Sequence, residues 1–403
     1  MKNFSLAHSV LLQILENNVS FSLAMRNAFK DDKNKAIIRH DISSLVGCSL
    51  RHYLVFTDRI DKHYQELTTA QVAYLLLALS NSLFIHLEET KKVNKELGRL
   101  AGLDDLDEFV SSIEANHLID EKYAPESNEY LSLRYNTPLW LVKMWRKHYG
   151  NNLTFRILKA NNKSANKYYL GKEDFVFDDK FEESSVPGVY KAIDEKNIDK
   201  DNLLPATPAM QYAINQIDID PLRGLTIYSE VTSNLLSHLS KYLNKYSKVD
   251  FLCGSPNCFF ETRRLIKELV LTKVDIYEVK SSGLITVMPN PVHTFIAMPH
   301  NSLFATLRSR PEFFLRINQD ELDNIIAHEY EVLNDAKDYV EEGGELLYMI
   351  ETMSNKEGHG NIERFLKENE NFTLKDEKQF FPCNSLESAF YFAILHRRGP
   401  NDD

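Results

Sequence analysis

The chain has 403 residues, of which 43% are hydrophobic and 26% are charged. This composition is typical of a globular protein and excludes global disorder, and at roughly 150 residues per domain the length predicts two or three domains. Lysine and arginine number 47 against 58 aspartates and glutamates, so the net charge is −11. A uniformly basic nucleic-acid binder is therefore excluded, and any nucleic-acid surface must be a local patch on an acidic body.

Residues 1–122 predict an all-helical bundle. Apolar side chains recur at helical spacing in Leu6–Leu15 and in Leu45–Ile60. A longer apolar block follows at Val72–Leu87, and proline, which breaks helices, is absent until Pro125. We interpret this region as one helical domain.

Residues 129–205 predict a small α+β connector. Pro138 at its start and Gly150 at its end delimit one short helix. Leu153–Leu158 reads as a strand. Residues 159–205 are mostly polar and predict short strands or loops.

Residues 206–403 alternate between predicted strands and predicted helices. The predicted strands are Leu225–Ser229, Val249–Cys253, Val274–Val279, Thr294–Met298, Glu345–Ile350 and Ala389–Leu395. The predicted helices are Leu235–Tyr246, Phe259–Leu271, Gln319–Val340 and Ile362–Asn369. This alternation predicts an α/β domain with a mostly parallel sheet and helices on both faces.

Cysteine use and hydropathy indicate a reduced, cytoplasmic compartment. Four cysteines are too few for a disulfide framework, and the spacing of Cys253 and Cys258 is not that of a zinc or redox pair. The longest apolar stretch, Tyr74–Leu87, is interrupted by polar residues and is shorter than the ~20 residues of a membrane span. Met1–Glu16 lacks the features of a secretory signal. We therefore expect no membrane contact.

Short motifs along nearly the whole chain resemble those of one protein family. In chain order they are Leu45–Arg51, Leu133–Pro138, Trp140–Lys143, Leu153–Arg156, Phe295–His300, Leu307–Glu312, Gln319–Leu322, Gly343–Tyr348, Asn361–Leu366 and Ala389–Ala393. Their order and spacing resemble the RsmB/Sun/NOP2 family of ribosomal RNA 5-methylcytosine methyltransferases. The resemblance implies a NusB-like helical domain over 1–122, an RNA-binding-like connector over 129–205, and a Rossmann-like class I methyltransferase domain over 206–403.

The features that bind the cofactor in that family are missing from this sequence. The family binds S-adenosylmethionine with the loop D-x-C-A-A-P-G-G-K-T, whose glycines let the backbone approach the cofactor. The corresponding Ile227–Leu236 keeps no glycine, proline or lysine. The family's cofactor-binding acids correspond to Cys253–Gly254, to about Ser281 or Ser282, and to Ala297. The resemblance therefore predicts neither cofactor-binding residues nor a cofactor.

The family's nucleophile is also missing. A thiolate adds to C6 of cytosine before methylation, and a second cysteine assists release. The two cysteine positions correspond to His300 and Glu351. A carboxylate is a far weaker nucleophile than a thiolate, and an imidazole here could only move protons. We predict no catalytic residue; the alternative is an active S-adenosylmethionine-dependent methyltransferase with a rearranged pocket.

One motif invites a metal interpretation. His328–Val332 begins like the zinc motif H-E-x-x-H but has no second histidine. A solvated helix face is the interpretation that the residues favour, and we predict no metal site.

Basic and aromatic residues are interleaved between residues 134 and 169. Cationic side chains pair with phosphates, and aromatic rings stack on bases. The aromatic members are Trp140, Trp145, Tyr149, Tyr168 and Tyr169. The alternative is a linker whose aromatic rings pack between domains. With the family resemblance, the predicted RNA-binding residues are Arg134, Lys143, Arg146, Lys147, Arg156, Lys159, Arg308 and Arg310.

Together these features predict a non-catalytic RNA-binding protein that acts on ribosomal RNA or in small-subunit assembly. The RNA class comes from the resemblance and not from composition. Two alternatives remain open, namely the active methyltransferase and a protein–protein adaptor that binds a partner through the NusB-like domain. The sequence names neither the RNA site nor the partner.

Overall fold

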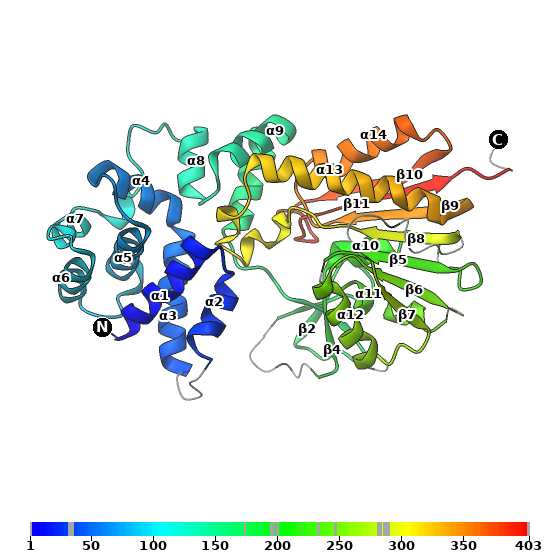
Figure 1. Cartoon of the computed structure of the whole chain (residues 1–403), viewed down its shortest axis with the longest axis horizontal. Coiled ribbons are helices and arrows are strands. Elements are labelled where there is room, and N and C mark those ends of the chain that lie inside the picture. The colour runs from blue at the N-terminus through cyan, green and yellow to red at the C-terminus, as the bar shows by residue number, and fades with distance from the viewer. Residues whose placement is uncertain are drawn as a thin grey trace. The chain divides into compact units, whose positions relative to one another are not determined.

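The computed structural model describes residues 2–30, 36–172, 175–193, 198, 201–218, 220–231, 234–245, 248–279, 284 and 291–400. The chain forms two compact units (Figure 1). The first unit comprises Met1–Lys163 and Thr306–Asn318, and the second comprises Ser164–Ala305 and Gln319–Asp403. A short segment from the C-terminal half therefore belongs to the N-terminal unit.

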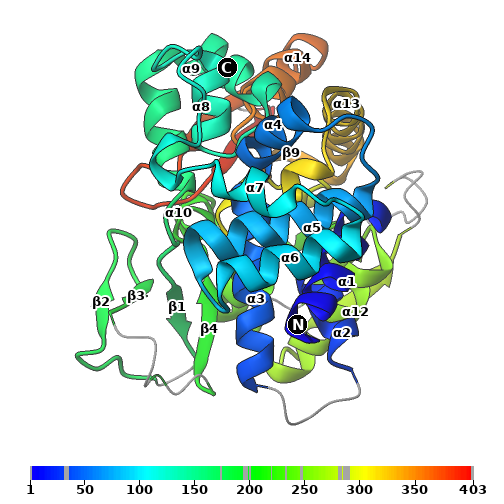
Figure 2. The ribbon, with the colours of Figure 1, turned by 90° about the vertical axis from the view of Figure 1, so that its left-hand side faces the viewer.

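The first unit is helical, which confirms the predicted helical region. Its helices are α1 (Lys2–Asn17), α2 (Phe21–Ala28), α3 (Ala36–Arg51), α4 (Tyr53–His63), α5 (Thr69–Ser80), α6 (Thr90–Ala101), α7 (Leu106–Ser111), α8 (Asn128–Arg134) and α9 (Leu139–Asn161). Helix α1 packs on α3 and α5, and α5 packs on α6 (Figure 2). Phe4, Leu11 and Phe56 are fully buried in the core between them. The likeness to NusB stays a prediction.

Helix α5 illustrates how the sequence specifies this bundle. The Thr68 hydroxyl accepts a hydrogen bond from the backbone N–H of Gln71, and the Gln71 side chain accepts one from the backbone N–H of Thr68. This capping box satisfies two backbone donors at the start of the helix. The Leu75–Leu79 run is fully buried, as expected for a helix that is surrounded by others.

Helix α9 bends sharply at Gly150. The backbone there adopts φ 74° and ψ 174°, a conformation that glycine tolerates and that divides α9 into two helical halves. The predicted end of a helix at Gly150 therefore matches this break, but the predicted strand at Leu153–Leu158 is wrong. Thr154, Ile157 and Leu158 are buried, and their spacing of three and four places them on one face of a helix.

The second unit begins with a small antiparallel sheet. Its strands are β1 (Tyr168–Gly171), β2 (Phe181–Glu183), β3 (Tyr190–Ala192) and β4 (Leu203–Ala206), in the order β2-β3-β1-β4. Tyr169, Ala192 and Leu203 form its apolar cluster. The short strands predicted in this polar region are confirmed.

A seven-stranded sheet forms the centre of the second unit. Its strands are β5 (Leu225–Ser229), β6 (Val249–Cys253), β7 (Val274–Glu278), β8 (Val292–Met298), β9 (Val340–Ile350), β10 (Phe372–Phe380) and β11 (Phe390–Arg397). The order is β10-β11-β9-β8-β5-β6-β7. Strands β5 to β9 pair in parallel, and β11 is antiparallel to both β9 and β10. The predicted mostly parallel sheet is confirmed.

Helices cover both faces of this sheet. They are α10 (Pro208–Ile214), α11 (Leu235–Leu243), α12 (Pro256–Glu268), α13 (Gln319–Ala336) and α14 (Asn361–Glu368). Ile227 of β5 belongs to the core cluster shared with α10 and α11, whereas its neighbour Tyr228 belongs to the cluster shared with α13 and α14. Successive side chains of a strand point to opposite faces, so the sheet lies between two layers of helices.

Strand β10 was not predicted from the sequence. It spans Phe372–Phe380 and forms the edge of the sheet, next to β11. The residues between its two terminal phenylalanines are mostly polar and only partly buried. An edge strand with polar side chains lacks the apolar run that identifies the buried strands.

Candidate functional site

The order of strands identifies a crevice in the second unit. Strand β5 pairs in parallel with β6 on one side and with β8 on the other, so the direction of winding reverses there. Ligands of open α/β sheets bind outside the carboxyl ends of the strands at such a point. In this chain the strands are followed by Glu230 after β5, Gly254 after β6 and His300 after β8.

The carboxylate of Glu230 lies at this switch point and is held by three groups. The Tyr228 hydroxyl donates to its Oε1 at 2.7 Å, and the backbone N–H of His300 donates to its Oε2 at 2.6 Å. Nε2 of His328, on α13, lies 2.9 and 2.8 Å from the two carboxylate oxygens. The side chain is only 6% exposed. Glu230 thus connects β5 to the loop after β8 and to α13.

The end of β6 is packed directly against this carboxylate. A β-carbon on Gly254 would lie 2.4 Å from Cγ of Glu230 and 2.5 Å from the Tyr228 hydroxyl. The Gly254 N–H also donates to the carbonyl of Ser229, and the Ser255 hydroxyl donates to the carbonyl of Glu230. Side chains of the chain itself therefore occupy the space between the ends of β5 and β6.

The contacts of Glu230 set the charges in this cluster. Burial raises the pKa of Glu230, but the hydrogen bonds from His328, from the His300 backbone and from Tyr228 outweigh burial and lower it overall. The hydrogen bond to Glu230 raises the pKa of His328. Burial, with the nearby carboxylate, raises the pKa of Tyr228. The lowered pKa favours the ionised form of Glu230, and the raised pKa favours the protonated form of His328. The two side chains therefore form a stable ion pair.

A second buried acid joins the loops after β8 and β9. Glu357 accepts a hydrogen bond from the Ser302 N–H at 2.8 Å and one from the Thr352 hydroxyl at 2.5 Å. Burial raises the pKa of Glu357. Burial and the nearby Glu357 carboxyl also raise the pKa of Glu329. These contacts tie together the two loops that carry His300 and Glu351.

The described residues do not fit S-adenosylmethionine. The positions compared with the family's acids hold Gly254 and the buried Ala297, and Glu230 fills the space that Gly254 leaves. Thr232, Ser233, Ser281 and Ser282 lie outside the described residues. His300 carries an exposed side chain where the family has a cysteine. Cys253 and Cys258 are buried, so neither presents a thiol to a substrate.

The interpretation of His328–Val332 as a solvated helix face is wrong. The side chain of His328 is 29% exposed and contacts Glu230, while Glu329 is fully buried. Sequence reasoning missed Glu230 altogether. A carboxylate within Ile227–Leu236, where the family has a small residue, was the available signal.

The predicted RNA-binding residues of the first unit differ in how accessible they are. Arg134, Lys143, Lys147, Arg156, Lys159 and Arg310 are exposed. Arg146 is half-buried, because its guanidinium donates to the Asn128 side chain at 2.7 Å and to the Glu126 carbonyl. Arg308 donates to the carbonyl of Lys163. Arg146 and Arg308 therefore have structural contacts of their own.

The aromatic residues of this region differ in how accessible they are. Trp145 is fully buried and Tyr169 is 5% exposed, so these two rings pack inside the protein, whereas Trp140, Tyr149 and Tyr168 are half-buried. Sequence reasoning missed Phe155, which is 40% exposed and contacts the Tyr135 ring edge-on at 6.0 Å. Its position beside Arg156 was the signal that could have identified it.

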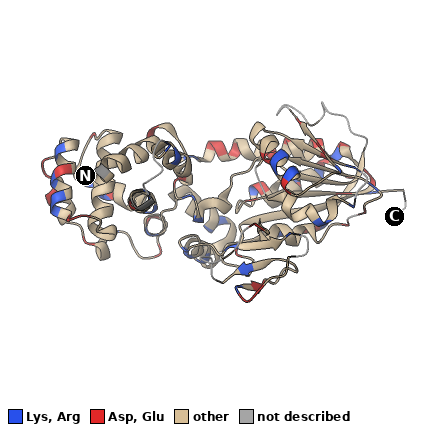
Figure 3. Cartoon of the chain, turned by 90° about the horizontal axis from the view of Figure 1, so that it is seen from below, with Lys and Arg blue, Asp and Glu red and all other residues tan. Residues whose placement is uncertain are grey.

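The charges of the chain are mixed. In Figure 3 basic and acidic residues are interspersed over the described parts of both units. No three histidine, cysteine or acidic side chains are grouped as metal ligands within the described part of the chain. Among those same residues, no helix is both long and apolar enough to cross a membrane.

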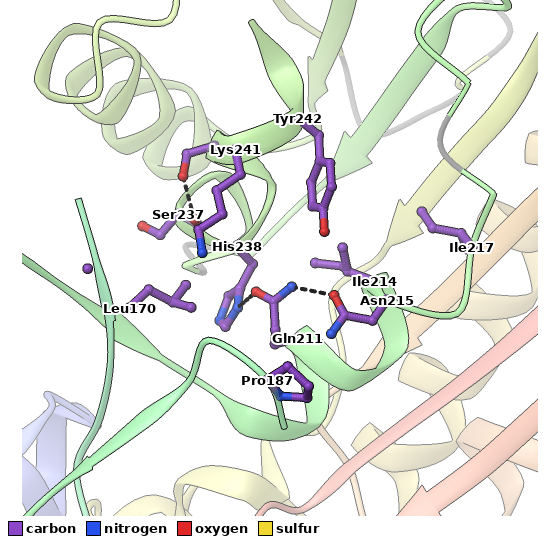
Figure 4. Close-up of a pocket in the computed structure, with 12 residues that line it drawn as sticks. Leu170, Pro187, Gln211, Ile214, Asn215, Ile217, Ser237, His238, Lys241 and Tyr242 are labelled. Atoms are coloured by element: carbon purple, nitrogen blue, oxygen red, sulfur yellow. Dashed lines mark hydrogen bonds between the residues drawn. The ribbon is translucent and has the colours of Figure 1, made fainter. Parts of the chain in front are cut away.

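A separate pocket of about 350 Å³ lies beside α10 and α11 (Figure 4). His238 lies at its inner end, accepts a hydrogen bond from the Thr207 N–H and donates to Gln211, which in turn donates to Asn215. Burial lowers the pKa of His238 to about 3, so its imidazole is neutral. This chain of hydrogen bonds connects α10 to α11 and gives both ring nitrogens of His238 a partner.

Comparison with known proteins places the fold. The sequence matches no known protein family and no curated protein. The crystal structure of PH0851 superposes with a TM-score of 0.75 at 16% identity, and the match covers 98% of this chain and 99% of that one.

Two further solved structures come from Pyrococcus horikoshii. A methyltransferase homologue matches with a TM-score of 0.56 at 13% identity, over 66% of this chain and 98% of that one. NSun6, solved with SFG, matches with a TM-score of 0.52 at 12% identity, over 64% of this chain and 98% of that one. At these identities the likeness concerns the fold. The chain thus combines a helical N-terminal region with a Rossmann-like fold of the methyltransferase type.

Proposed function

We propose that this protein is a non-catalytic RNA-binding protein that uses a methyltransferase fold as a scaffold and acts on ribosomal RNA or in small-subunit assembly. The proposal includes the NusB-like domain over 1–122, the connector over 129–205 and the methyltransferase-like domain over 206–403. A fold can be kept when its chemistry is lost, because the buried strands and helices do not depend on the site.

The position of Glu230 carries the non-catalytic part of the proposal. Its carboxylate is bound by Tyr228, His300 and His328 at the point where a ligand of this fold would lie. A ligand that entered would have to break these hydrogen bonds and leave buried polar groups without partners, which is costly. The His300 and Glu351 positions supply no thiolate for attack on cytosine.

The RNA part of the proposal rests on the family resemblance and on exposed cations. Lys143 and Lys147 lie one helical turn apart on α9, and both are exposed. Lys159 and the exposed ring of Phe155 lie beyond the bend at Gly150. Cations that pair with phosphates beside a ring that can stack on a base are the two components of single-strand recognition.

Crosslinking of RNA to the full-length protein in cells tests the proposal. The variant carries Lys143→Glu, Lys147→Glu and Lys159→Glu. A matched control carries Lys91→Glu, Lys92→Glu and Lys95→Glu, which make the same change of charge on exposed residues of α6. We expect RNA capture to fall by roughly tenfold or more in the first variant, because each lost phosphate contact weakens binding, and to persist in the control.

Three results would contradict the proposal. Capture by the first variant equal to that by the control would remove the assignment of RNA binding to Lys143, Lys147 and Lys159. Absence of RNA capture by the wild type, together with co-purification of a stable protein partner, would favour the adaptor. A methyl group added to ribosomal RNA incubated with the protein and S-adenosylmethionine, detected by mass spectrometry, would establish an enzyme.

A further inference from the structure

The first unit contains a hollow of about 740 Å³ that the sequence did not suggest. It lies between α2, α3 and the segment that returns from the C-terminal half. Its lining residues are Phe21, Ser22, Met25, Arg26, Arg39, His40, Ser43, Ser309, Arg310 and Glu312. The size is within the ~300–1,000 Å³ range of ligand sites.

Three arginines line this hollow without acidic partners. Arg26 lies on α2, Arg39 on α3 and Arg310 on the returning segment, and none of the three forms an ion pair with a described residue. Arginines elsewhere in the chain do find acids, as in Arg99 with Glu96 at 2.7 Å. In a chain with a net charge of −11, three unpaired guanidinium groups around one hollow form a local positive field.

Glu312 gives the hollow its second chemical feature. The residue is 2% exposed, and its Oε1 accepts a hydrogen bond from the Phe21 N–H at 3.2 Å. Its Oε2 is buried and has no partner within the described residues. A buried carboxylate oxygen without a donor is costly, so a ligand that supplies a donor at this point stabilises the site.

The required ligand therefore carries both an anion and a hydrogen-bond donor. Guanidinium groups bind phosphate oxygens through paired N–H groups, and the hydroxyls of Ser22, Ser43 and Ser309 add neutral contacts of the kind that position a backbone. The ribose 2′-hydroxyl is a donor close to the phosphate in RNA, and DNA lacks it. A simple inorganic anion fits this site less well, because it brings no hydrogen-bond donor to the carboxylate of Glu312.

We propose that this hollow binds a nucleotide of single-stranded RNA, with its phosphates on Arg26, Arg39 and Arg310 and its 2′-hydroxyl on Glu312. This inference rests on the proposed RNA-binding function and adds a second contact, on different helices from those that carry Lys143 and Lys147. Glu312 then has two roles. Its Oε1 anchors the returning segment to the start of α2, and its Oε2 distinguishes RNA from DNA.

Fluorescence anisotropy with the full-length protein tests the inference. The probes are labelled RNA and DNA strands of one sequence, each of roughly 12 nucleotides, measured at several salt concentrations. The variant Arg26→Glu/Arg39→Glu/Arg310→Glu is expected to weaken RNA binding by roughly tenfold or more and to reduce the salt slope by about 2, at about 0.7 per phosphate contact. The α6 control variant described above is expected to bind like the wild type.

The Glu312→Ala variant tests the acceptor that is proposed for the 2′-hydroxyl. It removes both carboxylate oxygens and adds no other hydrogen-bonding group, and thermal unfolding checks that it folds. We expect it to lose the preference for RNA over DNA, and a preserved preference would overturn the role of Glu312.

The outcomes separate the two proposals. If the arginine variant binds RNA like the wild type while the Lys143/Lys147/Lys159 variant does not, the hollow is excluded and the proposed function stands. If the wild type does not bind RNA, both fail. If DNA binds as tightly as RNA to the wild type, the 2′-hydroxyl contact is excluded.

Discussion

Two buried glutamates, one in each unit, have opposite surroundings. At the switch point of the sheet, Glu230 receives hydrogen bonds on both carboxylate oxygens, from Tyr228, His300 and His328. In the helical unit, Glu312 receives one, from Phe21, and its second oxygen is without a partner among the described residues.

The difference distinguishes a closed site from an open one. A carboxylate whose acceptors are all used gains nothing from a ligand, and it resists displacement because its donors would be left unpaired. A carboxylate with one unpaired oxygen, beside arginines that form no ion pair, can still form hydrogen bonds with a ligand. On this argument, the place where ligands of this fold usually bind is closed in this chain, and the binding site proposed above lies in the helical unit instead.

The largest expected effect comes from removing the closed carboxylate. Glu230→Ala leaves a histidine, a tyrosine hydroxyl and a backbone N–H without their acceptor, so we expect the free energy of unfolding to fall by roughly 3 kcal/mol. Urea denaturation of the full-length protein measures it, and Glu230→Gln, which keeps one of the two acceptor oxygens, should lose less. An unchanged unfolding midpoint in the alanine variant would mean that Glu230 does not hold the crevice closed.

The close packing at the end of β6 predicts the next effect. Gly254→Ala places a methyl group within 2.4 Å of Glu230 Cγ and 2.5 Å of the Tyr228 hydroxyl, and overpacking of this kind costs about 1–3 kcal/mol. In the double variant Gly254→Ala/Glu230→Ala, part of that cost should disappear, because the new methyl group no longer meets the Glu230 side chain. Strict additivity of the two changes would contradict the packing described here.

Glu312 should matter less to stability than Glu230. Glu312→Ala removes one acceptor at the start of α2 and also removes an unpaired buried oxygen, so we expect a loss of about 1 kcal/mol. The same urea experiment compares the two glutamates directly. A loss as large as that of Glu230→Ala would show that the hollow is a structural contact rather than an open site.

The ion pair of the closed site predicts a small pH dependence. The lowered pKa of Glu230 contributes stability above its ordinary value of 4.5, and this is lost as the pH falls through its folded value. The raised pKa of His328 contributes stability that is complete below 6.5 and is lost as the pH rises through its folded value.

The pair should therefore stabilise the protein most between pH 4.5 and 6.5. The difference in unfolding midpoint between the wild type and His328→Gln, followed from pH 4 to 9, isolates this contribution from other titrating groups. The difference should shrink as the pH rises past the folded value of His328. A difference that stays constant over this range would contradict the ion pair.

The sequence predicts the sheet well because its buried strands are short apolar runs. They are separated by segments in which apolar residues recur at helical spacing. It fails at Leu153–Leu158, where a short apolar segment fits a strand and a helix equally and only packing decides. It also fails at the polar edge strand β10, which presents no such run.

The site was predicted less well than the fold. The loss of the glycine-rich loop was visible in Ile227–Leu236, but the replacement was not, because Glu230 and His328 are 98 positions apart in the chain. The hollow is similar, since Arg26, Arg39 and Arg310 come from three segments that only the tertiary structure brings together. Of the predicted RNA-binding residues, only Arg310 lines it.

Isothermal titration of the wild-type protein with S-adenosylmethionine tests the central claim most directly. Glu230 and its partners fill the space between the ends of β5 and β6, so we expect no binding heat at concentrations where methyltransferases of this fold are saturated. Binding with a micromolar dissociation constant that is abolished by a substitution at the switch point would contradict the account, because it would show that the crevice opens.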